Sequence, residues 1–157
     1  MMLDMEVCCT GLAAEAQPAG LGIISFIGIT GEWGGSGVFC CSPAFAGTIC
    51  GRMLGIEPGN GTPAIDEEIL DVVAEITNMT IGNVKNLLEP VTGPLAISVP
   101  TVIHGRNFEF RNTSGLRGVA LGFEAAGHPF EVRISLAPMV GRVAARSRIP
   151  VLGLAQI

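Results

Sequence analysis

The sequence is short of positive charge and of long apolar runs. Its 157 residues carry 9 Lys and Arg against 14 Asp and Glu, a formal net charge of −5 at pH 7. Because phosphate groups bind to basic surfaces, this charge argues against nucleic acid as a partner. The longest apolar stretch, residues 19–29, is about half as long as a membrane-spanning helix and contains several glycines. We therefore expect no insertion into a membrane.

The sequence also lacks a secretory signal and the cysteine patterns of metal sites. Its start has neither a basic region nor an apolar core, so we expect a cytoplasmic protein. We interpret the cysteines as small buried side chains in a reducing compartment, rather than as redox groups. The five cysteines show no C-x-x-C or Cys/His spacing typical of a metal site. These residues are Cys8, Cys9, Cys40, Cys41 and Cys50.

Glycine and proline, by contrast, are abundant. With 22 Gly and 10 Pro, the chain is expected to make many turns, which favours a sheet-rich fold with a few helices. The length suits one domain with a substantial core. Short β-branched stretches between these turns predict strands at residues 4–10, 22–29, 37–41, 95–99, 101–103, 107–111, 118–123 and 130–136.

Two helices are predicted between these strands. Ser42 followed by Pro43 predicts the start of a helix of about twelve residues that reaches Leu54. Together with a longer helix after it, the order of elements predicts an α+β fold, with two main helices packed on a mostly antiparallel β-sheet. We expect one domain over residues 1–138, followed by a C-terminal extension, residues 139–157, to which no function is assigned.

The longer helix, from Asp66 to about Leu88, is the best-defined element of the sequence. Thr62-Pro63 predicts its capped start, and Glu89-Pro90 predicts its end. Its apolar residues recur at steps of three and four, which places them on one side of the helix: Ile69, Val72, Val73, Ile76, Thr80, Val84 and Leu87.

A polar stripe lies on another side of this helix. It consists of Asp71, Glu75, Asn78, Gly82 and Lys85. Glu75 and Asn78 share one helical face, with about 5–6 Å between their Cβ atoms. A carboxylate pairs with cations and an amide both donates and accepts hydrogen bonds, so the two can hold a water molecule or bridge two groups of a partner. A solvated helix face is the alternative interpretation.

The pattern Asp71-x3-Glu75-x2-Asn78, followed by Pro100, resembles the signature of the CheC/CheX/FliY chemotaxis phosphatases. The flanking residues are also similar, and the resemblance covers roughly residues 20–136. It is strongest to CheX-type domains, which carry a single copy of the motif. Asn78 and Pro100 are separated by 21 residues, one fewer than is usual in the family. We expect the N-terminal helix common in CheX domains to be shortened or missing here.

This resemblance implies dephosphorylation of a CheY-like response regulator. In the family, the helix lies across the regulator's phosphoaspartate site. Asn78 would then orient the attacking water, and Glu75 would pair with a lysine of the regulator. Asp71 and Pro100 would be supporting residues that shape the helix face and its neighbouring strand. Such catalysis depends on positioning and electrostatics.

The resemblance also implies partners and cofactors. The regulator supplies Mg²⁺, so the chain would need no metal or cofactor of its own, and CheX-type members are homodimers joined through sheet edges. A further E-x-x-N match, Glu109 to Asn112, lies in a predicted strand and is interpreted as chance. Two alternatives remain open. One is a non-catalytic module that binds a receiver or a flagellar-switch component, and the other is a sensory domain that binds a small ligand between helix and sheet.

Overall fold

The computed structural model describes residues 5–13, 22–56, 64–106 and 116–139. The predicted strand at residues 107–111, the second E-x-x-N match and the extension beyond Met139 lie outside these ranges. Within them the α+β prediction is confirmed. The elements are β1 (Val7–Leu12), β2 (Ile23–Gly31), β3 (Trp33–Cys41), α1 (Pro43–Leu54), α2 (Glu67–Thr92), β4 (Leu95–Ile97), β5 (Thr101–His104), β6 (Arg117–Ala125) and β7 (His128–Pro138).

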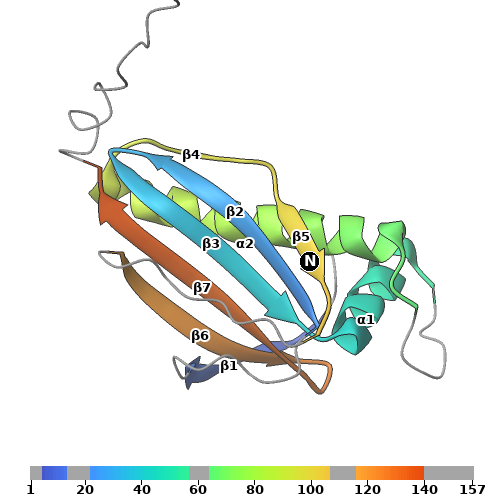
Figure 1. The fold of residues 1–157 in the computed structure, drawn as a ribbon. Coiled ribbons are helices and arrows are strands. Elements are labelled where there is room, and N and C mark those ends of the chain that lie inside the picture. Colours follow the sequence, from blue (N-terminus) through green and yellow to red (C-terminus); the bar gives the residue numbers. More distant parts are fainter. Residues whose placement is uncertain (1–4, 14–21, 57–63, 107–115, 140–157) are drawn as a thin grey trace, which may run out of the picture.

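The strands form one antiparallel sheet (Figure 1). They follow the order β1-β6-β7-β3-β2-β4, and β5 also pairs with β2. β5 pairs with the start of β2, at Ile23–Phe26, and β4 pairs with its end, at Ile29–Gly31. β2 and β3 form one hairpin, in which only Glu32 separates the strands, and β6 and β7 form another. In the described part of the chain, β1 is therefore one edge of the sheet, and β4 and β5 form the other.

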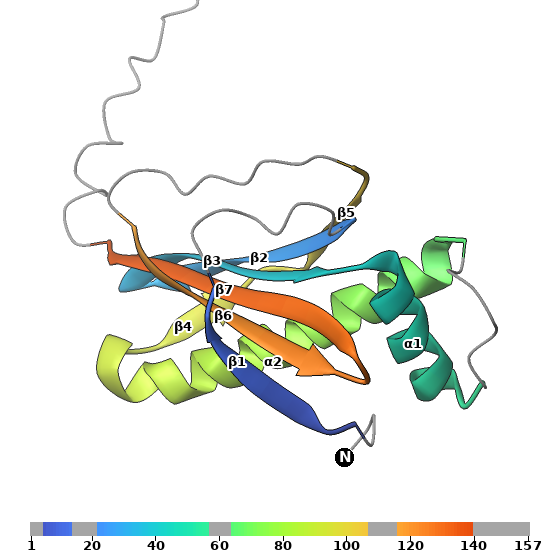
Figure 2. The same cartoon turned by 90° about the horizontal axis from the view of Figure 1, so that it is seen from below.

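Both helices lie on the same face of the sheet (Figure 2). α1 begins as predicted, with Pro43 in its first turn and Ser42 Oγ accepting a hydrogen bond from Phe45 N at 3.1 Å. It ends at Gly55, which adopts φ +69°. α2 crosses the sheet and contacts strands β2, β3, β4 and β5. Among the described residues, no helix combines the length and the apolar character needed to cross a membrane.

α2 starts within one residue of the predicted Asp66, but its predicted cap and its predicted stop are both wrong. Its N-cap is Asp66, whose Oδ1 accepts a hydrogen bond from Ile69 N at 3.0 Å, and not Thr62, which lies outside the described residues. At the other end Pro90 does not stop the helix, because a proline so close to the end removes little of the hydrogen-bond ladder. The helix continues to Thr92 and ends at Gly93, where φ is +77°.

The buried side of α2 also differs from the predicted one. Ile69, Val73, Thr77 and Ile81 are buried and follow one another at steps of four residues. Each such step turns about 40° further around the helix, so the buried side shifts gradually along its length. Leu87, which the sequence pattern assigns to the apolar side, is therefore 78% exposed. Buried Thr77 and Ile81 fall outside that pattern.

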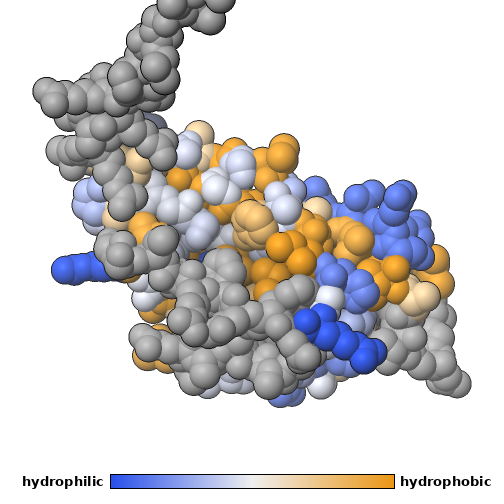
Figure 3. Space-filling view, in the orientation of Figure 1, coloured by the Kyte–Doolittle hydropathy of each residue, from blue (hydrophilic) through white to orange (hydrophobic). Residues whose placement is uncertain are grey.

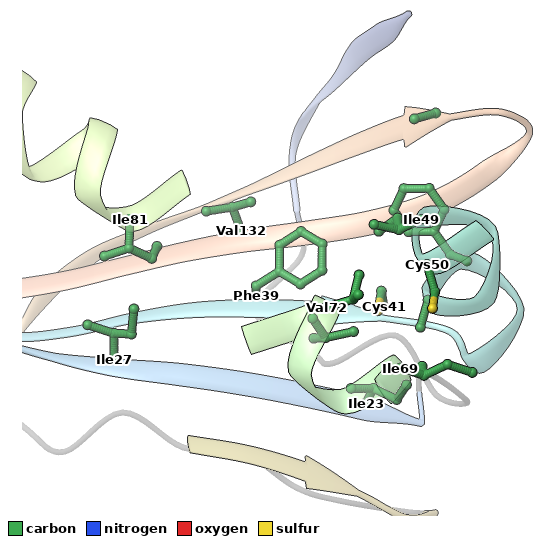
Figure 4. Packing of buried hydrophobic residues seen from close by; sticks show 14 of the residues in the cluster. Ile23, Ile27, Phe39, Cys41, Ile49, Cys50, Ile69, Val72, Ile81 and Val132 are labelled. Carbon is green, nitrogen blue, oxygen red and sulfur yellow. The ribbon is translucent and has the colours of Figure 1, made fainter. Parts of the chain in front are cut away.

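α2 approaches the sheet closely where Ile81 lies over Gly37 of β3. A Cβ added to Gly37 would lie 2.6 Å from Ile81 Cδ1, so glycine is required beneath this side chain. Ile81 points down towards Ile27 in the core (Figure 4), and both side chains are fully buried. Because interiors are close-packed, this contact fixes both the height of α2 above the sheet and its rotation about its own axis.

The prediction that the cysteines are buried is confirmed for three of them and wrong for two. Cys40, Cys41 and Cys50 are buried, and burial raises the pKa of the Cys40 and Cys41 thiols to about 12. These two thiols are therefore protonated and unreactive at neutral pH. Cys8 and Cys9 are exposed because they lie on β1, an edge strand whose residues are all exposed. All five thiols are free.

We predict that Gly37→Ala and Ile81→Ala each destabilise the fold but partly compensate when combined. The added methyl overpacks the contact, which costs about 1–3 kcal/mol, and Ile81→Ala leaves a cavity, which costs about 2–5 kcal/mol. In the double variant the methyl fills part of that cavity. The loss in free energy of unfolding, measured by urea denaturation, should then be smaller than the sum of the two single losses.

Gly28→Ala is the matched control, because the nearest atom of the described residues, Ser98 Oγ, would lie 3.5 Å from its added Cβ. Its effect should simply add to that of Ile81→Ala. Strict additivity of Gly37→Ala and Ile81→Ala would contradict the close contact between β3 and α2.

Candidate functional site

The polar stripe of α2 faces away from the core. Asp71 and Glu75 are exposed, and Asn78 is half-buried. Because these residues follow one another at steps of four and three, their side chains lie on one side of the helix. The Cβ atoms of Glu75 and Asn78 are about 5–6 Å apart. The structure thus brings Asp71, Glu75 and Asn78 together on one solvent-facing surface.

The fold itself makes no use of the Glu75 and Asn78 side chains. Within the described part of the chain, neither makes a hydrogen bond or an ion pair. On the buried side, by contrast, Thr77 Oγ1 donates a hydrogen bond to Val73 O at 2.7 Å. A carboxylate and an amide without internal partners are available to a cation and a water molecule of a second molecule.

Pro100, the fourth predicted site residue, lies in the connector between β4 and β5. Both strands contact α2, so the connector runs alongside the helix (Figure 1). Two hydrogen bonds of 2.9 Å anchor Ser98 to β2: Gly28 N donates to Ser98 Oγ, and Ser98 N donates to Gly28 O. Pro100 is half-buried, and its neighbour Val99 is 82% exposed. The connector therefore presents an apolar side chain to solvent from an anchored backbone.

Contacts among Lys85, Glu89 and Leu95, which we call the brace, join the end of α2 to β4. Lys85 Nζ and Glu89 Oε1 form an ion pair at 2.7 Å, one helical turn apart. The same oxygen accepts a hydrogen bond from Leu95 N at 3.0 Å. The hydrogen bond from Lys85, with that from Leu95 N, lowers the pKa of the Glu89 carboxyl. This pair was not predicted from the sequence, although the i,i+4 spacing of Lys85 and Glu89 is its signal.

The start of α2 is acidic. Glu67 and Glu68 follow the cap Asp66 in the first turn. Figure 3 shows hydrophilic residues gathered over this part of α2 and apolar residues beside them around β5, where Ile103 is 42% exposed. In the described residues, no group of three or more His, Cys, Asp or Glu side chains is placed to hold a metal ion. An acidic surface with an apolar neighbour suits a partner that offers a basic side chain.

A second concave surface, which was not predicted from the sequence, lies between α2 and strands β6 and β7. Two adjoining hollows of about 310 Å³ and 460 Å³ share Thr80, Phe123 and Val132, and we call them together the β6–β7 groove. The groove exists because the two described helices do not cover the whole of the described seven-stranded sheet. That imbalance is the signal that predicts it. Its remaining walls are apolar for the most part and include Phe39, Phe45, Ile76, Val84, Leu88, Leu121, Phe130 and Ile134.

The sequence profile of the family described as chemotaxis phosphatase CheX matches residues 23–124. The match includes Asp71, Glu75, Asn78 and Pro100, and it covers both helices. The chain belongs to the CheX family. A known relative, the CheY-P phosphatase CheX of Thermotoga maritima, is 31% identical over 90 residues, which are 57% of this chain and 56% of the relative. The matched segment thus spans little more than half the length of that CheX.

Solved structures of CheX proteins share the fold. The chemotaxis protein CheX from Vibrio vulnificus has a TM-score of 0.71 at 25% identity, over 87% of each chain. A chain of the CheX–CheY–BeF3–Mg²⁺ complex from Borrelia burgdorferi has a TM-score of 0.66 at 24% identity, over 86% of this chain and 87% of that one. The α+β fold predicted from the sequence is thus confirmed, and it is the fold of CheC-like proteins.

We predict that Glu89→Gln loosens the end of α2 in a pH-dependent manner. Because the pKa of Glu89 is lowered in the folded state, its contribution to stability is present above the ordinary value of 4.5 and is lost as the pH falls through the lowered value. The variant should melt at a lower temperature than the wild type at neutral pH, and the difference should vanish in acid. Thermal melts followed by circular dichroism measure it.

Glu124→Gln is the control, since Glu124 is an exposed acid on β6, away from the brace. A difference in melting temperature that appears only in the Glu89 variant supports the brace. A difference that is equally large at acid and neutral pH would contradict it.

Proposed function

We propose that this chain is a phosphatase that removes the phosphoryl group from the phosphoaspartate of a CheY-like response regulator. The observation that carries the proposal is the pair Glu75 and Asn78, which share the solvent-facing side of α2 and have no partner within the described part of the chain. Membership of the CheX family and the likeness to the CheY-P phosphatase CheX of Thermotoga maritima support it.

In this mechanism Asn78 positions the attacking water. Water attacks the phosphorus of the aspartyl phosphate, the bond from phosphorus to the carboxylate oxygen breaks, and dihydrogen phosphate leaves with both protons of the water. Asn78 Oδ1 accepts a hydrogen bond from that water and turns its lone pair towards the phosphorus. An amide is too weak a base to take the proton, so its contribution is to hold the water in line.

Glu75 fixes the position of the regulator along α2. Its carboxylate pairs with a lysine of the regulator, and this contact sets where Asn78 lies relative to the phosphoryl group. A charge pair that becomes shielded from water on docking both orients the partners and disfavours a wrong alignment. Because Glu75 and Asn78 project from one rigid helix, fixing the first also fixes the second.

The remaining site residues and the metal complete the proposal. Asp71 extends the acidic side of α2 by one turn, and Pro100 restricts the backbone of the connector beside it. Mg²⁺ is held by the regulator, where it neutralises charge on the phosphoryl oxygens. CheX from Borrelia burgdorferi occurs in a complex with CheY, BeF3 and Mg²⁺, which is the assembly that this mechanism requires.

We further propose that the protein acts in the cytoplasm, where response regulators work, as a homodimer joined through sheet edges. β1 supports the dimer: it is an edge strand, its six residues are exposed, and none of them is charged. Uncharged edge strands readily pair with another chain. Residues 1–138 would form the catalytic domain, since Asp71 to Pro100 lie well inside it.

We predict that the wild-type protein accelerates the decay of a phosphorylated CheY-type regulator and that Asn78→Ala abolishes most of this effect. Loss of one positioned catalytic hydrogen bond lowers turnover by about 10²-fold or more. Binding of the regulator activated with BeF3 and Mg²⁺ should change only a few-fold, because the variant removes positioning and not the docking surface. Decay is followed by the release of inorganic phosphate.

Asn83→Ala is the control, since Asn83 is exposed on the same helix but lies about 140° around it from Asn78, off the stripe. It should retain wild-type activity. If the wild type binds regulators of its host but accelerates the decay of none, the chain is a non-catalytic receiver-binding module. If Asn78→Ala is as active as the wild type, the assigned role of Asn78 is wrong.

A further inference from the structure

Gly82 lies in the middle of α2, on the polar stripe, one turn after Asn78. Glycine is the poorest helix former after proline, so a glycine inside a helix calls for a physical reason. Elsewhere in this chain the reason is crowding: a Cβ on Gly51 of α1 would lie 2.9 Å from Ile56 O, and one on Gly37 would meet Ile81.

Among the described residues, no such crowding surrounds Gly82. Of their atoms, a Cβ built there would meet Ile97 Cδ1 at 3.8 Å and no other within 4 Å, and this distance is ordinary van der Waals contact. The residue also needs no unusual backbone, because it lies within the regular helix. The fold of the chain therefore accommodates alanine at this position.

The surface around Gly82 is that of the proposed catalytic site. Asn78 lies one turn before it on the stripe, and Lys85 follows within one turn. On the side of β4, Ile97 reaches position 82, and the connector beyond it presents Val99. Because glycine has no side chain, the surface of α2 is lower at Gly82, between Asn78 and the connector. A partner that brings its phosphoryl group to Asn78 must cover this spot.

We infer that Gly82 is a positioning residue that lets the backbone of the phosphorylated receiver domain approach α2 closely. The inference rests on the proposed function and names the part of the helix on which the regulator lies. Gly82 acts through Asn78: a side chain at position 82 would hold the receiver away from the helix and leave the water of Asn78 short of the phosphorus. Misplacement by about 1 Å can cost about 10²-fold in a reaction catalysed by positioning.

The test is the pair Gly82→Ala and Gly82→Gln. We expect Gly82→Ala to raise the melting temperature, because alanine favours the helix, and yet to weaken binding of the BeF3- and Mg²⁺-activated regulator. The value of kcat/KM for the phosphorylated regulator should fall about 10-fold in the alanine variant and further in the glutamine variant, in proportion to the added bulk. A residue with a merely structural role would not raise stability while lowering association.

Asn83→Ala is the matched control, since it also favours the helix but lies on the side of the β6–β7 groove, off the stripe. It should raise stability and leave binding and turnover unchanged. If the wild type is active and Gly82→Ala binds and turns over as well as the wild type, the inference is overturned and the proposed function stands. If Gly82→Ala lowers the melting temperature, a packing role explains the glycine and the inference is also overturned. An inactive wild type would instead remove the proposed function.

Discussion

The functional surface depends on how α2 is seated on the sheet. Ile81 lies over Gly37 of β3, and at the far end Glu89 accepts a hydrogen bond from Leu95 N of β4. Turning a helix by one residue position rotates its side chains by about 100°, enough to carry the polar stripe out of solvent. These two contacts therefore decide which residues of α2 a partner meets.

The two sides of α2 perform different tasks. The buried side, with Val73 and Thr77, takes up the constraints of packing and internal hydrogen bonding. The opposite side is thereby left with polar groups that the fold does not use, Glu75 and Asn78. A rigid helix presents them with little conformational freedom left to lose on binding, which is what catalysis by positioning demands.

The sequence predicted best what depends on local pattern, and least what depends on tertiary contacts. The stripe of Glu75 and Asn78 follows from helical periodicity, and the limits of α1 follow from Ser42-Pro43 and Gly55. Periodicity alone assigns no catalytic role to the stripe. That role was inferred from the family resemblance. Pro90 is tolerated because it falls in the last turns of a packed helix. Leu87 is exposed because the buried side shifts along α2. The exposure of Cys8 and the position of the groove at β6 and β7 both follow from strand order, which no local pattern encodes.

In the described part of the chain, two surfaces beside α2 offer themselves to a response regulator, the polar stripe with its connector and the apolar β6–β7 groove. Mapping of amide chemical shifts on titration with a CheY-type regulator, activated with BeF3 and Mg²⁺, distinguishes them directly. We expect the largest changes between Asp71 and Lys85 and at Ile97–Val99, with little change at Leu121–Phe123 of β6. The largest changes at Leu121–Phe123, with an unperturbed stripe, would contradict the assignment of α2 as the surface that meets the phosphoaspartate.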